Sequence, residues 1–368
     1  KVVKRLTAGV EALLKSNGVE MYSGEAFIHP DKTVSAGNVK VSADKVIFAG
    51  GSKAVKINIP GIELEHVLTS DEILDLDHVP KRLVIIGGGV IGVELASVFA
   101  AFGSKVAIIE LMDNVLPMMD NDISSAICKS LNKKGIKTYT GTKLEKIEEA
   151  DGYLKVYSDK QEPIDTEYVL LSIGRIPDLT AIQELDLDKD SGRIKVDDTM
   201  RSSLDWLYAP GDINGRSMLA HSAFKMGETA AENAMGHSKK VNLSYVPSCV
   251  YTSPEVGSVG MTEQQAQTNY DVSIGMFPFQ ANGRALASGE IEGYVKVITD
   301  KKYGEVLGVH IVGPSATELI NEAAALMSME VTANEIADII HAHPTYAEAF
   351  MEAAADSISE CLHLPKNK

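Results

Sequence analysis

Cysteine is scarce in this 368-residue chain, which contains only Cys128, Cys249 and Cys361. They are far apart, odd in number and form no C-x-x-C pair, so the sequence supports neither a zinc knuckle nor a local disulfide. Cys128 lies beside an apolar helical stripe, and we expect it to be packed rather than reactive. This usage favours a reducing compartment, so we expect a cytoplasmic protein.

Basic residues are fewer than acidic ones, and long apolar runs are absent from the sequence. The chain has 35 Lys and Arg against 51 Asp and Glu, and its net charge of −16 would repel a phosphate backbone. No apolar run reaches membrane-spanning length, so the sequence predicts a soluble globular protein with neither a nucleic-acid nor a membrane partner. The 45% of hydrophobic residues can build cores for two or three domains.

The sequence begins without an initiator methionine, inside or at the edge of an amphipathic helix. In "KVVKRLTAGVEALLKSNG" one helical stripe is apolar and Gly18 is a natural stop. The apolar residues of the stripe are Val2, Val3, Leu6, Val10, Leu13 and Leu14. We therefore expect a further N-terminal segment to precede Lys1.

The segment "RLVIIGGGVIGVELA" is the most informative motif in the chain. A hydrophobic strand over 83–86 runs into G-x-G-x-x-G at Gly87, Gly89 and Gly92, and a helix follows from Val90. In a dinucleotide-binding βαβ unit the first glycine makes a tight turn and the second lets a pyrophosphate approach the backbone. The third lets the helix pack closely against the strand.

The next apolar strand, "KVAIIE", ends at Glu110, which is 110 − 92 = 18 positions past the third glycine. A ribose-binding carboxylate is expected near this position, and no arginine follows in "ELMDN", so the pattern favours NAD over NADP. A glycine-rich turn followed by a surface glutamate is the simpler alternative. Glu94 stands early in the helix, where a carboxylate that stabilises the helix N-terminus is also the simpler interpretation.

A second motif, "HAHPTYAEAF", lies near the end of the chain. Pro344 fixes the backbone, and Thr345 is predicted to cap a helix that begins near it. His343 and Glu348 are one to one and a half turns apart, so the carboxylate could hold one imidazole nitrogen and make the other a stronger base. The alternative is a capped helix with a solvated histidine. His341 is expected to point the same way as His343, but a zinc site would lack a third ligand.

Several segments, taken in order, resemble the dihydrolipoamide dehydrogenase group of the flavoprotein pyridine-nucleotide disulfide reductase family, and the resemblance covers essentially the whole chain. The segments are "VIIGGGVIGVELA", "VAIIE", "SIGRIPD", "YAPGDI", "MLAHSA", "YTSPEVGSVGMTE", "FPFQANGRA" and "HAHPTYAEA". One departure is "AHSAFKMGE", where the family usually has an acidic pair before the glycine.

The resemblance implies catalytic roles for two residues. His343 would carry a proton to and from a thiol of dihydrolipoamide, and Glu348 would orient the imidazole. In this family the histidine reaches the flavin site of the other subunit, which implies a homodimer formed through the C-terminal domain.

The resemblance also implies FAD and NAD as cofactors. Glu94 would lie near the nicotinamide, Glu110 would hold the adenine ribose, and Asp212 would bind the ribityl chain of FAD. The full set of cofactor-binding residues is Gly87, Gly89, Gly92, Glu94, Glu110, Gly174, Arg175, Gly50, Asp212, Met218, Leu219 and Ala220.

The expected fold is α/β, with Rossmann-like FAD and NAD domains and a C-terminal α+β dimerisation domain. The FAD domain, expected to be truncated, would comprise 1–75 and 196–245. The NAD domain would span 76–195, and the dimerisation domain 246–368. The family's first G-x-G-x-x-G and its C-x-x-x-x-C redox pair are not in this sequence, so we expect both upstream of Lys1 and expect the chain as given to be inactive.

The function implied for the complete protein is oxidation of protein-bound dihydrolipoamide to lipoamide, with electrons passing through a redox disulfide and FAD to NAD. The partners implied are lipoyl-bearing proteins of 2-oxo acid dehydrogenase or glycine-cleavage complexes. Two alternatives remain open, another NAD(P)H-dependent disulfide reductase and a non-catalytic NAD-binding dimerisation module.

Overall fold

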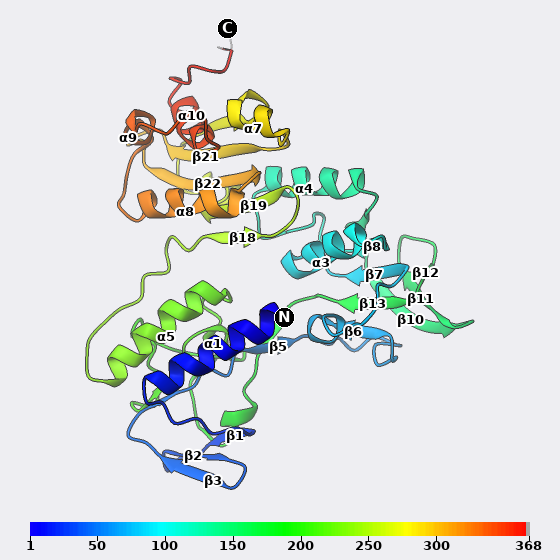
Figure 1. Ribbon diagram of the computed structural model, residues 1–368, viewed down its shortest axis with the longest axis vertical. Helices are drawn as coiled ribbons and strands as arrows, with labels where there is room; N and C mark the ends of the chain where they lie inside the picture. Colours follow the sequence, from blue (N-terminus) through cyan, green and yellow to red (C-terminus); the bar gives the residue numbers. More distant parts are fainter. Residues whose placement is uncertain (366–368) are drawn as a thin grey trace. The chain divides into compact units, whose positions relative to one another are not determined.

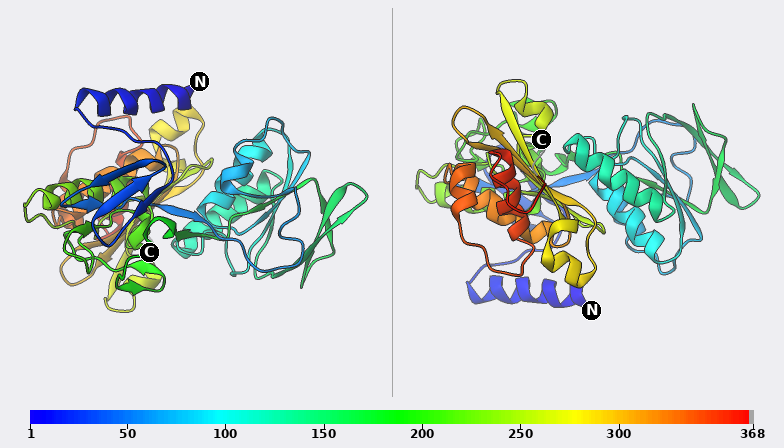
Figure 2. Two further views of the ribbon diagram at one scale, coloured as in Figure 1. Left: turned by 90° about the horizontal axis from the view of Figure 1, so that it is seen from below. Right: turned by 90° about the horizontal axis from the view of Figure 1, so that it is seen from above.

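A computed structural model describes residues 1–365, which form two compact units (Figures 1 and 2). The first unit comprises Lys1–Lys53 and Ile176–Val241. The second comprises Ala54–Arg175 and the chain from Asn242 onward. The chain therefore enters the second unit at Ala54, returns to the first after Arg175 and re-enters the second at Asn242.

The first unit contains two long helices and several short strands. Helix α1 (Val2–Ser16) follows the predicted apolar stripe, yet none of its residues is buried. The other elements of this unit are α5 (Ala220–Ala234), β1 (Ala26–Ile28), β2 (Thr33–Ala36), β3 (Val39–Ser42), β4 (Val46–Ile47), β15 (Lys189–Asp190), β16 (Arg193–Ile194), β17 (Leu207–Tyr208), η1 (Thr180–Ile182) and η2 (Asp212–Asn214). Strands β4 and β17 are parallel, and their core includes Phe48, Trp206 and Ile213.

A parallel five-stranded sheet forms the first half of the second unit, in the order β6-β13-β7-β8-β9. Its strands are β6 (Val67–Thr69), β13 (Tyr168–Leu171), β7 (Arg82–Ile86), β8 (Lys105–Ile109) and β9 (Lys137–Tyr139). Both faces are buried, which explains why β7 and β8 are continuous apolar runs rather than alternating ones.

Different elements cover the two faces of this sheet. Leu83 and Ile85 pack in the same core as residues of α3 (Val90–Ala101) and α4 (Asn121–Lys133). Val84 and Ile86 pack in another core with residues of a small antiparallel sheet. That sheet consists of β10 (Leu144–Ala150), β11 (Tyr153–Ser158) and β12 (Ile164–Thr166). The predicted strand–glycine turn–helix–strand unit is thus present as β7-α3-β8.

An antiparallel five-stranded sheet forms the second half of the second unit, in the order β18-β19-β22-β21-β20. Its strands are β18 (Ser248–Val250), β19 (Glu255–Gly260), β22 (Val306–Gly313), β21 (Tyr294–Asp300) and β20 (Val272–Pro278). Helices α8 (Ala316–Met327), α9 (Ala333–Asp338) and α10 (Glu348–Ser357) pack on it around Phe279 and Phe350. Val256 and Val312 share a core with Ile123 and Ile127 of α4, which joins the two halves.

The remaining short elements are α2 (Ser70–Ile73), α6 (Glu263–Ala266), α7 (Gly283–Ser288), η3 (Phe279–Ala281), and the paired strands β5 (Ser52–Ala54) and β14 (Arg175–Pro177). Among residues 1–365, no helix is long and apolar enough to cross a membrane.

Candidate active site

The glycine-rich turn after β7 has the geometry that its sequence predicts. Gly87 has φ +104°, and a Cβ built there would lie 2.5 Å from the carbonyl oxygen of Ser172. A Cβ on Gly92 would lie 2.0 Å from the carbonyl oxygen of Gly87, so α3 can approach the turn this closely only with glycine. A Cβ on Gly89 would have no atom within 4 Å. The turn is therefore open at Gly89, at the N-terminus of α3, where an anionic group can reach the backbone amides.

Glu110 follows β8 directly, and its side chain is held against this turn. One carboxylate oxygen, Oε2, accepts a hydrogen bond from the amide of Gly88 at 2.5 Å, and Oε1 accepts one from the amide of Met112 at 2.7 Å. The residue is only 7% exposed. Since each carboxylate oxygen has a second lone pair, the fixed side chain can still accept bonds from the two hydroxyls of a ribose. The turn and Glu110 together fit the adenosine and pyrophosphate parts of NAD.

Glu94 lies on α3 and contacts the segment that follows β18. Its Oε1 accepts a hydrogen bond from the amide of Tyr251 at 2.7 Å. Burial raises the pKa of the Glu94 carboxyl above its ordinary value, and the bond from Tyr251 opposes this effect only in part.

Gly174 and Arg175, which follow β13 in the chain, lie at the carboxyl edge of the parallel sheet. Gly174 has φ +125°, and a Cβ there would meet no atom within 4 Å. Arg175 reaches α2, where its Nη1 donates to Ser70 Oγ at 3.3 Å and lies 3.5 Å from Asp71 Oδ1. Gly174 and Arg175 therefore lie at the same sheet edge as Gly87 and Glu110, which is the edge where open α/β sheets bind ligands.

The residues assigned to flavin binding lie in the first unit. Ser52 Oγ donates to Asp212 Oδ2 at 2.6 Å, and Asp212 follows Gly211, whose φ is +84°. A Cβ on Gly50 would come within 2.3 Å of the Phe48 ring, so a side chain at this position would require the ring to move. At the start of α5, Leu219 occupies the N-cap, Met218 is half-buried and Ala220 is exposed. A carboxylate fixed by a hydroxyl beside a glycine turn suits a polyol chain such as the ribityl group.

The histidine and the acid of the C-terminal motif are paired. His343 Nδ1 lies 2.9 Å from Glu348 Oε1, and the amide of Thr345 donates to Glu348 Oε2 at 2.8 Å. Burial opposes ionisation of Glu348, but the Thr345 amide and His343 outweigh it, so the pKa of the carboxyl is lowered. The His343 side chain is 77% exposed, and no group among residues 1–365 hydrogen bonds to its Nε2. The pair thus presents one imidazole nitrogen to an incoming proton donor.

Two details of this motif differ from the prediction. Helix α10 begins at Glu348, and the Thr345 hydroxyl donates to the carbonyl of Ala342 instead of capping the helix. His341 does not share the environment of His343, because its side chain is only 5% exposed and its Nε2 lies 2.9 Å from Glu322 Oε1. Glu322 lies on α8, so no local spacing revealed this partner. In the described part of the chain, no cluster of three or more His, Cys, Asp or Glu side chains could hold a metal ion.

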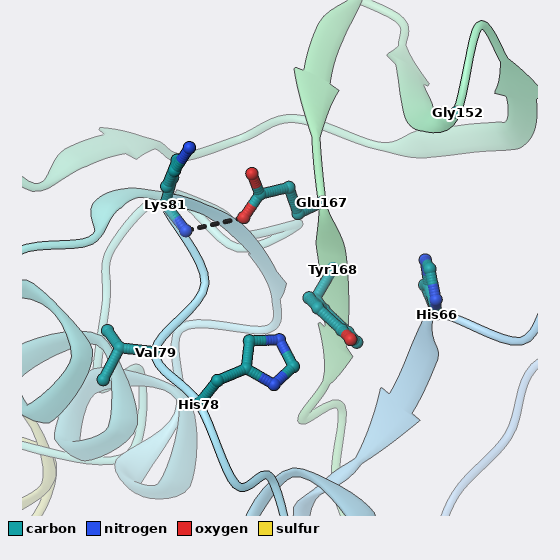
Figure 3. A pocket seen from close by; sticks show the side chains of 7 residues that line it. All are labelled: His66, His78, Val79, Lys81, Gly152, Glu167 and Tyr168. Atoms are coloured by element: carbon teal, nitrogen blue, oxygen red, sulfur yellow. Dashed lines mark hydrogen bonds between the residues drawn. The ribbon is translucent and has the colours of Figure 1, made fainter.

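A hollow of about 320 Å³ lies at the opposite edge of the parallel sheet (Figure 3). His66 and His78 flank the ring of Tyr168, with ring centroids 4.7 Å and 5.6 Å away, and the amide of Lys81 donates to Glu167. These residues precede or begin β6, β7 and β13. The hollow is therefore at the amino ends of the strands, away from the edge that carries the glycine turn.

Comparison with known proteins agrees with this geometry. Residues 1–227 match the pyridine nucleotide-disulphide oxidoreductase family, and residues 246–354 match its dimerisation domain. The chain belongs to this family, whose members use FAD and NAD.

Curated relatives match over nearly the whole chain. A dihydrolipoyl dehydrogenase of Bacillus subtilis is 39% identical over 99% of this chain and 81% of its own length. A dihydrolipoyl dehydrogenase of Haloferax volcanii is 37% identical over 98% of this chain and 80% of its own length.

Solved structures are similar as well. The HOCl-induced flavoprotein disulfide reductase RclA of Escherichia coli superposes with a TM-score of 0.87 and 27% identity, covering 96% of this chain and 85% of that one. LpdA of Mycobacterium tuberculosis gives a TM-score of 0.88 with 25% identity, covering 96% of this chain and 80% of that one.

Proposed function

We propose that this protein is a dihydrolipoyl dehydrogenase, which oxidises protein-bound dihydrolipoamide to lipoamide and reduces NAD to NADH. The observation that carries the proposal is the His343–Glu348 pair, with Nδ1 held by a carboxylate and Nε2 exposed. A dithiol must lose protons before its sulfurs can attack a disulfide, so the reaction needs a base of this kind.

In this mechanism His343 acts through a single atom. Nε2 takes a proton from a thiol of dihydrolipoamide, which becomes a thiolate, and the imidazole becomes a cation. Glu348 faces Nδ1 and stabilises that cation, and its lowered pKa keeps the carboxylate ionised. The product lipoamide is a disulfide and takes no proton back, so Nε2 releases the proton to solvent, and the net products are lipoamide, NADH and one proton.

Each of the two cofactors is assigned to a different set of residues, NAD to the glycine turn after β7 and FAD to residues of the first unit. Gly87, Gly89 and Gly92 would hold the NAD pyrophosphate, and Glu110 its adenine ribose. Glu94 would lie beside the nicotinamide, and Gly174 and Arg175 would border the same site. On the flavin side, Gly50, Asp212 and the start of α5 (Met218, Leu219 and Ala220) would contact FAD. FAD and NAD supply the two-electron chemistry when they are bound.

The proposal includes three domains, one homodimer and one class of partner. The FAD domain would comprise 1–75 and 196–245, the NAD domain 76–195 and the dimerisation domain 246–368, of which 366–368 lie outside the described residues. The match of 246–354 to a dimerisation domain supports the dimer. Lipoyl-bearing proteins of 2-oxo acid dehydrogenase or glycine-cleavage complexes would bring the substrate, and free Cys128, Cys249 and Cys361 suit a cytoplasmic location.

Substitution of His343 in the complete protein tests the catalytic role. We expect His343→Gln to lower dihydrolipoamide–NAD turnover by about 10²- to 10⁴-fold, the contribution of a positioned general base, and to leave NADH affinity unchanged. Steady-state turnover and NADH fluorescence titration measure the two effects.

His363 provides a matched control, because it also pairs with a glutamate of α10, Glu352. His363→Gln should retain turnover within about twofold of the unsubstituted protein. Equal losses in both variants would contradict the role of His343. Turnover with glutathione disulfide and NADPH, in place of dihydrolipoamide and NAD, would instead identify another disulfide reductase.

A further inference from the structure

Lys296 is a charged residue in the middle of an apolar core strand. It lies on β21, its side chain is 0% exposed, and its neighbours Val295 and Val297 are fully buried. A lysine at such a position needs partners that compensate for the loss of water.

Three carboxylates surround the Lys296 ammonium. Its Nζ lies 2.9 Å from Asp120 Oδ1, 2.6 Å from Asp122 Oδ2 and 2.6 Å from Glu263 Oε2. Burial alone would lower the pKa of the ammonium, but the hydrogen bonds to the carboxylates outweigh burial and raise it. Lys296 is therefore a cation that connects the antiparallel sheet to the start of α4.

Asp120 connects the Lys296 ammonium to the half of the second unit that contains the parallel sheet. It is the N-cap of α4, its Oδ1 accepts from the amide of Asp122, and its Oδ2 accepts from the amide of Glu263. The Asp120 side chain is also fully buried. Its position is thus set by the C-terminal half of the unit as much as by its own helix.

The segment from 111 to 119, which we call the adenosine loop, connects Glu110 to Asp120. At its middle, the amide of Leu116 donates to the carbonyl of Gly88 at 2.7 Å. Val115 Cγ1 lies 3.1 Å from the position that a Cβ on Gly88 would take. The loop therefore packs on the glycine turn at its middle and is anchored by Asp120 at its C-terminal end.

We propose that Lys296 is a positioning residue for dinucleotide binding, which acts through Asp120 and the adenosine loop on Gly88 and Glu110. The inference rests on the proposed assignment of this turn to NAD. Lys296 touches neither the glycine turn nor Glu110, so its effect is on the affinity of the site and not on the chemical step.

Substitution of Lys296 by methionine in the complete protein tests the inference. Lys296→Met keeps the length of the side chain but leaves Asp120 as a buried carboxylate without its cation. We expect NADH to bind about tenfold more weakly in a fluorescence titration, with a matching rise in KM for NAD. Reduction of the protein's flavin by dihydrolipoamide without NAD should remain within about twofold of the unsubstituted rate.

Two further variants separate positioning from general stability. Asp120→Asn keeps the helix cap and should weaken NADH binding about threefold, which provides a test if Lys296→Met does not fold. Lys301→Met removes an exposed pair with Asp271 after the same strand and should leave the affinity unchanged.

Unchanged NADH affinity in Lys296→Met and Asp120→Asn, with only a lower melting temperature, would overturn the inference and leave Lys296 a structural residue. Equal weakening in Lys301→Met would overturn it too. A different result would contradict the proposed function, namely that the unsubstituted protein binds NADH but does not oxidise dihydrolipoamide.

Discussion

At the scale of single residues, Glu94 shows how a site is built at the expense of stability. Its carboxyl is partly buried, and the hydrogen bond from the Tyr251 amide does not offset the loss of water. The folded pKa therefore lies above the unfolded one. The protonated Glu94 carboxyl contributes stability that is fully present below the pKa of the unfolded state. This contribution is lost as the pH rises through the pKa of the folded state.

Glu94→Gln should remove this pH dependence. The glutamine carbonyl can still accept the Tyr251 bond, and it carries no charge, so we expect the variant to melt higher than the unsubstituted protein at pH 8 and equally at pH 4. NADH oxidation should fall, because the carboxylate is proposed to lie beside the nicotinamide. Calorimetry at the two pH values and steady-state turnover measure both effects, and a lower melting temperature at pH 8 would contradict the argument.

At the scale of elements, the β7-α3-β8 unit contains glycines with two different physical duties. Gly92 allows the close contact of α3 with the turn, since a Cβ there would lie 2.0 Å from the carbonyl of Gly87. Gly89 has φ −71°, which any residue adopts, and open space in front of it. The fold therefore does not require glycine at this position, and the lack of a side chain is consistent with the proposed approach of a pyrophosphate.

Alanine substitutions should separate the two duties. Gly92→Ala should destabilise the protein by roughly 1–3 kcal/mol, because α3 must shift to relieve the overlap. Gly89→Ala should change stability by less than about 0.5 kcal/mol, yet weaken NADH binding by about tenfold or more, because the methyl group would occupy the space of the pyrophosphate. Denaturant unfolding and NADH titration test this, and normal NADH affinity in Gly89→Ala would remove the NAD assignment.

At the scale of the whole molecule, the exposed Nε2 of His343 suits a base that serves a neighbouring subunit. The matched dimerisation domain contains both His343 and Glu348, while the glycine turn after β7 lies outside it. If His343 completes the site of the partner, each dimer has two sites of mixed origin.

Mixed dimers test this arrangement. At an NAD concentration well below saturation, His343→Gln homodimers should be inactive and Gly89→Ala homodimers should retain about a tenth or less of the unsubstituted activity. Random mixing of the two kinds of subunit should give about a quarter of the unsubstituted activity, because one of the two sites in each mixed dimer contains both intact residues. A site formed within one subunit would give no recovery. Turnover after co-unfolding and refolding, or after co-expression, distinguishes the two outcomes.

The motifs that the sequence predicted best are those whose geometry is local. The turn at Gly87, the helix from Val90 and the position of Glu110 all follow from one strand–turn–helix–strand unit. The His343–Glu348 pair also lies within six residues, and its spacing allowed the contact that the family resemblance implied. The prediction that Thr345 caps the helix was wrong. The amide of Thr345 donates to the Glu348 side chain, and α10 begins only at Glu348.

Long-range partners were beyond the reach of the sequence. Lys296 is 176 positions from Asp120, and His341 is 19 positions from Glu322, so no periodicity links them. A lysine between valines in "YVKVIT" was the one visible signal of a buried cation. The sequence by itself determined the glycine turn, the position of Glu110 directly after β8 and the spacing of His343 and Glu348, because neighbours along one chain are constrained by backbone geometry. Only the tertiary structure decided which buried charges meet, because that depends on how separate sheets and helices pack.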